Sequence, residues 1–221
     1  MNLEGARKDV KVFCIGLQKT GTKSLKHLMR RMGYRHYKRT AYASKLWWDG
    51  DVAGLVDTME AFDSAEDWPW PLCWREMDAA FGDRARFILT RRTNAEAWLD
   101  SITRWSLRTN PEGHSRTRIY GHAYPHGAEQ AYLDFYEGHL VAVRAAFADR
   151  PHQLLEICFE EGDGAEAVAE FLGEEPPRRG AVHQNSSATN PAVTGFEEEN
   201  LRLAMAQKER LLAARQKKAG H

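Results

Sequence analysis

The chain has few cysteines and no long hydrophobic run. Its 221 residues include only three cysteines, Cys14, Cys73 and Cys158, which are scattered among apolar neighbours. An odd number at such spacings favours reduced core thiols and argues against disulfides, a metal site or redox chemistry. No segment approaches the roughly 18 apolar residues of a membrane-spanning helix, and the polar stretch 1–10 lacks the apolar core of a signal peptide. We therefore expect a cytoplasmic protein without a membrane span.

The chain also lacks net charge. Its 31 Lys and Arg residues balance 31 Asp and Glu residues, for a formal charge of zero. Nucleic-acid-binding domains usually carry a basic excess, so nucleic acid is not an expected partner and any anion site must be local. A chain of this length fits one α/β core. We expect a single domain over residues 1–221.

Short β-prone runs alternate with segments of helical periodicity along most of the chain. This alternation predicts a three-layer α/β fold, with a mostly parallel sheet flanked by helices on both faces. Strands are expected at residues 11–15, 34–38, 86–90 and 154–159, helices at 25–32, 72–81, 94–108, 128–148, 164–172 and 196–217, an ordered loop at 62–71 and a further loop at 109–127.

Two of these segments raise functional questions. The loop 109–127 is rich in Gly, Pro, His, Arg and Tyr, and long loops in compact domains are usually functional or mobile. It is interpreted as a substrate-side loop or lid. The last helix, 196–217, is charged and amphipathic, which is compatible with packing on the body or with pairing two copies in a homodimer.

A glycine loop follows the first expected strand. It reads Gly16-Leu-Gln-Lys-Thr-Gly-Thr-Lys-Ser24 and leads directly into a helix. Such a loop directs backbone N–H groups and the positive end of the helix dipole at one point, where an anion is stabilised. Lys19 adds a cation there. The hydroxyl groups of Thr20, Thr22 and Ser24 add donors, so a phosphate could accept several charge-assisted hydrogen bonds of about 1.5–3 kcal/mol each.

The loop departs from the Walker A pattern of nucleoside-triphosphate enzymes. That pattern requires Lys immediately after its second glycine, whereas Thr22 stands there and Lys23 comes one residue later. One residue turns a helical side chain by about 100°, so Lys23 is not positioned as a Walker lysine. Lys19, inside the loop, is the better candidate for contact with the phosphates.

The sequence from Gln18 to Leu25 resembles the 5′-phosphosulfate loop of sulfotransferases that use 3′-phosphoadenosine-5′-phosphosulfate (PAPS), and later segments resemble a bacterial branch of that family. The resemblance implies a P-loop-kinase-like fold, PAPS as donor, 3′-phosphoadenosine-5′-phosphate (PAP) as product, a small-molecule acceptor and no catalytic metal. It implies that Lys19 touches the phosphosulfate linkage. The donor contacts that it implies are Gln18, Lys19, Thr20, Gly21, Thr22, Lys23 and Ser24.

The 3′-phosphate of PAPS requires a second anion site, for which Arg is suited because its planar fork binds phosphate bidentately. The strand Phe87-Ile-Leu-Thr-Arg-Arg92 followed by Ser101 resembles the family's 3′-phosphate site. The family's usual separation from Arg to Ser is eight residues, whereas Arg92 lies nine and Arg91 ten residues before Ser101. Arg92 is favoured because the sequence Phe87-Ile-Leu-Thr-x-Arg92 aligns it with the arginine of the family. Arg91 remains an alternative ligand of the 3′-phosphate.

A general base must take the proton of the acceptor. Asp67 lies between the two phosphate segments, where related enzymes carry a His or a carboxylate, and the aromatic residues of Trp68-Pro-Trp-Pro71 could desolvate it and raise its pKa. A turn-capping role explains the same Asp equally well. His122 and His126 are alternatives, although nine histidines make a chance position in a loop common.

The distribution of tryptophan bears on the chemical nature of the acceptor. Six of the seven tryptophans lie between residues 47 and 74 or at Trp105, which is compatible with an aromatic or apolar acceptor, although tryptophan is also an ordinary core residue. Further cofactor contacts are implied by a looser resemblance at Gly162-Asp-Gly164, at Phe171-Leu-Gly173 and at residues 178–187, including His183 and Asn185.

Two other functions fit the same fold. One is a small-molecule kinase that uses ATP and Mg²⁺, which the missing Walker lysine opposes. The other is a nucleotide-binding protein that keeps the fold without catalysis. Binding of PAP rather than ATP with Mg²⁺ would separate the first alternative from a sulfotransferase, and product formation would separate the second.

Overall fold

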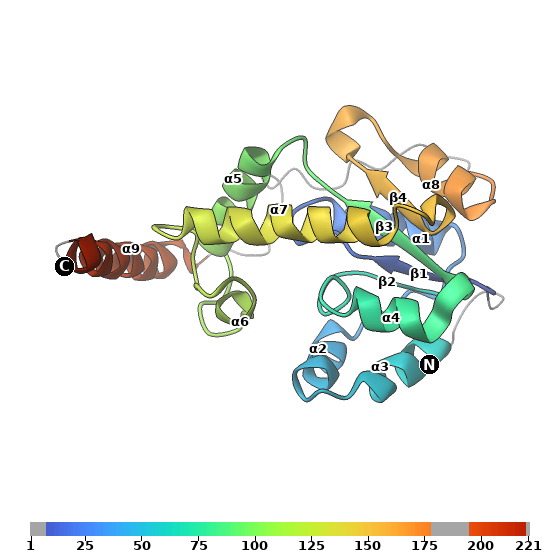
Figure 1. Ribbon diagram of the computed structural model, residues 1–221, viewed down its shortest axis with the longest axis horizontal. Helices are drawn as coiled ribbons and strands as arrows, with labels where there is room; N and C mark the ends of the chain where they lie inside the picture. The colour runs from blue at the N-terminus through green and yellow to red at the C-terminus, as the bar shows by residue number, and fades with distance from the viewer. Residues whose placement is uncertain (1–7, 178–194, 220–221) are drawn as a thin grey trace. The chain divides into compact units, whose positions relative to one another are not determined.

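The computed structural model describes residues 8–177 and 195–219, which fall into two compact units (Figure 1). Unit 1 contains the described residues 8–93 and 144–177, and unit 2 contains residues 94–143 and 195–219. The expectation of one domain over the whole chain stays a prediction. None of the helices in the described ranges is long and apolar enough to cross a membrane.

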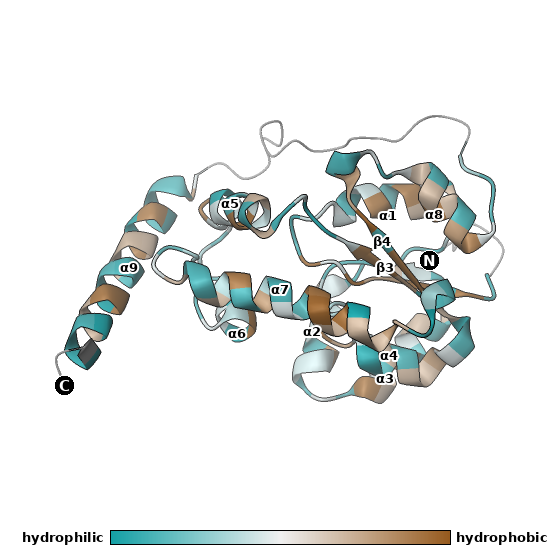
Figure 2. Ribbon diagram, turned by 45° about the horizontal axis from the view of Figure 1, so that its top comes forward, coloured by the Kyte–Doolittle hydropathy of each residue, from teal (hydrophilic) through white to brown (hydrophobic). Residues whose placement is uncertain are grey.

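Unit 1 is built on a four-stranded parallel sheet. Its strands are β1 (Lys11–Cys14), β2 (Ser64–Ala65), β3 (Ala85–Thr90) and β4 (Leu154–Ile157), in the spatial order β2-β1-β3-β4. Strands β3 and β4 are coloured as hydrophobic in Figure 2, as expected for a parallel sheet covered on both faces. The predicted α/β fold, a mostly parallel sheet flanked by helices, is confirmed.

The two faces of the sheet bury different side chains because successive residues of a strand point to opposite sides. On one face, Val12 and Cys14 pack beneath α1 (Thr22–Arg31) and α8 (Ala165–Leu172). On the other face, the ring of Phe13 lies 5.7 Å from that of Phe81, at the end of α4 (Trp74–Phe81). The glycine loop leaves β1 between these two layers.

Shorter elements complete unit 1. Buried Lys11 donates to the carbonyls of Glu60 and Phe62, which satisfies its charge and ties the end of α3 to β1. The remaining elements are α2 (Thr40–Trp48), α3 (Val52–Glu60) and the 3₁₀ turns η1 (Gly82–Arg84), η2 (Pro151–Gln153) and η3 (Phe159–Glu161).

The prediction of a strand at 34–38 was wrong. In this segment only His36 forms a bridge, and its partner Ser64 belongs to β2, which lies within the segment 62–71 that was expected to be a loop. Tyr34 and Tyr37 are buried, and the Tyr37 N–H donates to the carbonyl of Ser64 at 2.8 Å, as part of this single bridge. The segment is therefore buried at Tyr34, His36 and Tyr37 but forms one bridge in place of the expected strand.

Unit 2 contains α5 (Ala95–Ser106), α6 (Arg116–Tyr120), α7 (Glu129–Ala146) up to Val143, and α9 (Glu197–Ala219). The Trp98 ring stacks on that of Tyr136 at 4.4 Å. Buried Arg116 donates to Thr109 and to the carbonyl of Ala123. The segment 109–127 thus contains a helix that the sequence did not predict, because a buried arginine organises it from within.

Candidate active site

The glycine loop is packed against the end of β3. A side chain at Gly16 would overlap the hydroxyl and carbonyl of Thr90, so only glycine lets the chain pass there. The Thr20 hydroxyl donates to the carbonyl of Leu17 at 2.6 Å and lies 2.6 Å from the Thr90 hydroxyl. Thr20, predicted as a donor contact, therefore uses its side chain to hold the loop in shape.

Two residues of the loop adopt left-handed backbone conformations. The φ angle is 72° at Lys19 and 107° at Gly21. For a non-glycine residue this conformation is uncommon, and where it occurs it often marks a functional site. Among the described residues, the non-glycine residues with positive φ are Lys19 and Asp67, which the sequence nominated for catalysis.

Helix α1 begins immediately after this turn. Its N-cap is Gly21, which has no side chain to cap the helix, and the first turn contains no acidic residue. Thr22 is buried, Ser24 is partly buried and Lys23 is exposed. The helix therefore presents an uncompensated positive dipole end beside Lys19, which is suited to an anion.

Gly21 combines a close side-chain contact with a left-handed backbone conformation. A Cβ atom at this position would lie 2.5 Å from the Phe159 ring, in addition to the cost of φ 107°. We expect Gly21→Ala to lower the free energy of unfolding by about 1–3 kcal/mol more than Gly33→Ala. Gly33 is a matched control, since its φ is 81° but a Cβ atom there would meet nothing within 4 Å. Urea unfolding measures both, and equal losses would show that the Phe159 contact is not limiting.

Asp67 lies beside the loop because Gln18 holds it there. The Gln18 Nε2 atom donates to Asp67 Oδ1 at 3.1 Å. Burial, and next the negative charge of Glu66, raise the pKa of Asp67, while the bonds from Gln18 and from the Trp68 backbone oppose the rise. A carboxyl group with a raised pKa is suited to accept a proton. The structure thus brings Gln18 and Asp67, both predicted, into one site.

A partly buried ion pair adjoins Asp67. Lys26 Nζ lies 3.0 Å from Glu66 Oε1, and the Glu66 side chain is 6% exposed. Glu66 directly precedes Asp67 in the chain, and Lys26 comes from α1. The charge of Glu66 raises the pKa of Asp67, and Lys26 lowers it.

The two arginines after β3 have different surroundings. Arg91 donates to Glu156 at 2.8 Å and makes two bonds, of 3.0 and 2.7 Å, to the carboxylate of Glu161. These carboxylates, with Glu161 first, raise the pKa of Arg91 further above its usual value. Arg92 is paired with Glu160 at 2.7 Å. Arg91 is therefore bound to the body of unit 1 on two sides.

These features occupy the segment that matches a known family. Residues 11–118 match the family model described as a sulfotransferase domain. This match supports a sulfotransferase family. No curated protein matches the chain in a sequence comparison. The matched segment includes the glycine loop, Asp67, Arg92 and Ser101.

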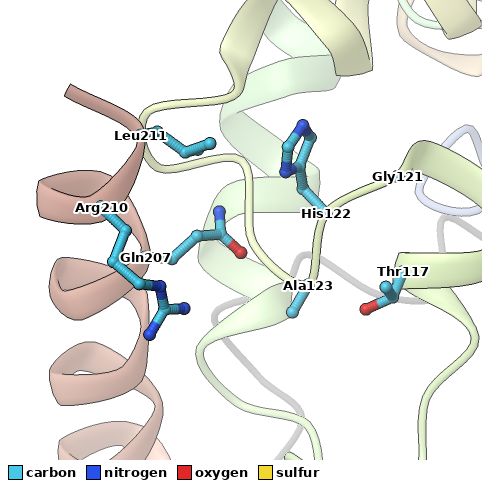
Figure 3. Close-up of a pocket in the computed structure, with 7 residues that line it drawn as sticks. All are labelled: Thr117, Gly121, His122, Ala123, Gln207, Arg210 and Leu211. Carbon is cyan, nitrogen blue, oxygen red and sulfur yellow. The ribbon is translucent and has the colours of Figure 1, made fainter. Parts of the chain in front are cut away.

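The remaining candidates belong to unit 2. Ser101 is buried on α5. His122 lines a pocket of about 320 Å³ together with α9 residues (Figure 3). The pKa of His126 is lowered, mainly by burial. The assignments of Ser101 to the 3′-phosphate and of either histidine to proton transfer stay predictions.

The later segments that resembled cofactor contacts have structural roles where they are described. Asp163 accepts the backbone N–H of Cys158 at 2.7 Å, and Gly173 ends α8 with φ 66°. Residues 178–187, with His183 and Asn185, lie outside the described residues. Within 8–177 and 195–219, no group of three or more His, Cys, Asp or Glu residues could hold a metal ion.

Sequence reasoning missed the residues that support the site. Thr90 anchors the loop, and the pair of Glu66 and Lys26 sets the electrostatics beside Asp67. The adjacent acids Glu66 and Asp67 were a usable signal, since the charge of Glu66 raises the pKa of Asp67. Thr90 gave no signal, because its role depends on a contact with Thr20, 70 residues earlier in the chain.

Proposed function

We propose that the protein transfers a sulfuryl group from PAPS to a hydroxyl or amine of a small-molecule acceptor and releases PAP. The observation that carries the proposal is the hydrogen bond from Gln18 to Asp67, because it holds a carboxylate beside the loop that would cradle the donor. The family match supports sulfuryl transfer, and the two phosphates of PAPS fit the loop and the arginine-bearing end of β3.

The donor's 5′ end would lie at the N-terminus of α1. The helix dipole and backbone N–H groups there stabilise phosphate and sulfate oxygens. Lys19 would lie over the bridging oxygen between phosphorus and sulfur. As that bond breaks, negative charge grows on the phosphate oxygen, and a cation that meets it in the transition state lowers the barrier.

Asp67 would complete the reaction as the general base. The acceptor oxygen or nitrogen forms a bond to sulfur while the bond from sulfur to the 5′-phosphate oxygen breaks, and its electron pair stays on that oxygen. The acceptor proton moves to Asp67. Gln18 donates to Oδ1 of Asp67, and because each carboxylate oxygen has two lone pairs, Asp67 keeps acceptor capacity for this proton. In this proposal Asp67 acts as the base, and Lys19 is the cation that meets the charge on the leaving phosphate oxygen.

Arg92 is the better candidate of the two arginines for the 3′-phosphate, with Ser101 as the expected second contact. Arg91 is bound by Glu156 and by both oxygens of Glu161, so recruiting it would break several charge-assisted bonds. Arg92 pairs with Glu160, an exposed carboxylate, and an exposed ion pair is weak because water screens it.

Calorimetry with PAP tests the donor site. We expect PAP to bind without metal and more tightly than ATP with Mg²⁺; the reverse preference would favour the kinase alternative. Arg92→Gln should weaken PAP binding about 10–150-fold, which corresponds to a charge-assisted bond of about 1.5–3 kcal/mol. Arg91→Gln should lower the melting temperature more than the affinity. If Arg91→Gln alone weakened PAP binding, the assignment would be reversed.

Labelled PAPS then tests transfer itself. Formation of labelled product with any hydroxyl or amine acceptor supports the proposal, whereas tight PAP binding without product supports a non-catalytic nucleotide-binding protein. An aromatic or apolar acceptor stays a prediction, and Trp70, Trp74 and Trp98 lend it little support because they are core residues. A homodimer through α9, which exposes Leu201 and Leu212, is likewise untested.

A further inference from the structure

One stretch of unit 1 carries charge of a single sign. Residues 10–48 contain ten Lys or Arg residues and no Asp or Glu, although the whole chain is balanced at 31 of each sign. Some of these cations are structural: Lys11 is buried against carbonyls, and Arg35 forms a bidentate pair with Asp63. The others concentrate on α1 and on the segment that follows it.

Helix α1 has one apolar face and one basic face. Leu25, Leu28 and Met29 are buried against the sheet. Lys23, Lys26 and Arg30 recur at spacings of three and four residues and are partly or fully exposed, so they lie on the opposite face.

Helix stability does not explain this basic face. Like charges at i and i+4, as at Lys26 and Arg30, cost about 0.2–0.5 kcal/mol. Lys23 in the first turn also meets the unfavourable end of the helix dipole. A helix face exposed only to water would be more stable if positive and negative side chains alternated along it. The uniformly positive charge of this face therefore indicates an anionic ligand.

The segment after α1 contributes a buried imidazole, His36, and a further cation, Lys38, to the same place. His36 is 5% exposed, and its Nδ1 atom lies 2.9 Å from the Ser64 hydroxyl. Its Nε2 atom is buried and has no hydrogen-bond partner among the described residues. Burial first, and then the charges of Lys26, Arg30 and Lys38, lower its pKa to about 3. These cations therefore converge around one buried imidazole. We call Lys23, Lys26, His27, Arg30 and Lys38 the basic face.

The sheet order relates the basic face to the reaction. Strand β2, which leads to Asp67, lies on one side of β1, and β3, which leads to Arg92, lies on the other. Lys26 pairs with Glu66, the residue before Asp67, and His36 bridges to Ser64 in β2. The basic face thus adjoins the side of the proposed base and lies away from the side proposed for the donor's 3′-phosphate.

We propose that the acceptor is anionic, carrying a carboxylate, phosphate or sulfate group that the basic face binds, in addition to the hydroxyl or amine that receives the sulfuryl group. This inference rests on the proposed function and specifies its acceptor class. From Lys23 to Arg30 the helix rises by roughly 10 Å. The basic face therefore suits an acceptor whose negative charge is separated from its reactive group by several bonds.

Matched acceptor pairs test the inference. Phenols and alcohols that bear a carboxylate are compared with their methyl esters in the labelled-PAPS assay. We expect the acids to have acceptor KM values about 10-fold or more below those of the esters, rising with salt because exposed charges are screened. The double variant Arg30→Glu and Lys38→Glu should raise KM for the acids about 10–100-fold. The same double variant should have nearly unchanged KM values for the esters and for PAPS.

The control reverses two exposed cations elsewhere, Lys217→Glu and Lys218→Glu, and should leave the ratio between acids and esters unchanged. As a measurement that needs no turnover, fluorescence anisotropy follows binding of pyranine, a trisulfonated hydroxypyrene, to the protein saturated with PAP. Loss of pyranine binding only in the Arg30 and Lys38 variant supports the inference. Equal use of acids and esters, or equal pyranine binding by both variants, would overturn it. Absence of PAP binding would instead overturn the proposed function.

Discussion

Replacing Lys19 by alanine should lower kcat for sulfuryl transfer by about 10²–10³-fold, the usual effect of removing one group that stabilises charge in a transition state. The binding of PAP should change far less, because the charge that Lys19 meets grows only as the bond between sulfur and the phosphate oxygen breaks. Single-turnover kinetics with labelled PAPS measures the first effect, and calorimetry with PAP measures the second.

The backbone of Lys19 allows its side-chain and conformational effects to be separated. Its φ of 72° is unfavourable for lysine and alanine alike and favourable for glycine. Lys19→Gly should therefore lose as much activity as Lys19→Ala while gaining stability of about 1 kcal/mol. Lys45→Ala, an exposed lysine on α2, is the control for lost positive charge. Unchanged turnover in both Lys19 variants would remove this residue from the mechanism.

The fold was predictable where burial alone decides it. The segments 11–15 and 86–90 are short apolar runs, and they form β1 and β3 because central parallel strands are buried on both faces. Strand β2 was not predictable: it has two residues, Ser64 and Ala65, and its pairing with β1 depends on the surrounding structure rather than on its own composition. The loop after it, which carries Asp67, was expected from its prolines.

The site was predictable in its residue types but not in its geometry. A glycine loop with an internal lysine predicts an anion site. The left-handed backbone conformation of Lys19 was not predictable, because lysine rarely adopts it. The contact between Gln18 and Asp67 joins residues 49 positions apart. The preference for Arg92 over Arg91 depends on Glu156 and Glu161, more than 60 positions downstream.

Asp67→Asn is the second decisive variant, and we expect it to lower kcat by about 10²–10⁴-fold, the usual contribution of a positioned base. Because burial and Glu66 raise the pKa of Asp67, the acid limb of kcat/KM in the native enzyme should lie above the ordinary aspartate range. Glu66→Gln removes the neighbouring charge and should move that limb to lower pH. If the limb persisted in Asp67→Asn, the base would lie elsewhere, and His122→Gln and His126→Gln would identify it.

The same variant should be more stable than the native protein at neutral pH. The raised pKa means that the folded protein binds the Asp67 proton more tightly than the unfolded chain does, so stability falls as pH rises from the unfolded to the folded pKa of this group. Asparagine carries no charge to bury, still accepts the bond from Gln18, and tolerates the left-handed φ of 68°. The melting temperatures of the two proteins should therefore be similar at acidic pH. Toward pH 7 the melting temperature of the variant should become the higher of the two. A variant that is both inactive and more stable is the expected signature of a carboxylate kept buried for catalysis, whereas a turn-capping Asp would lose stability on the same change.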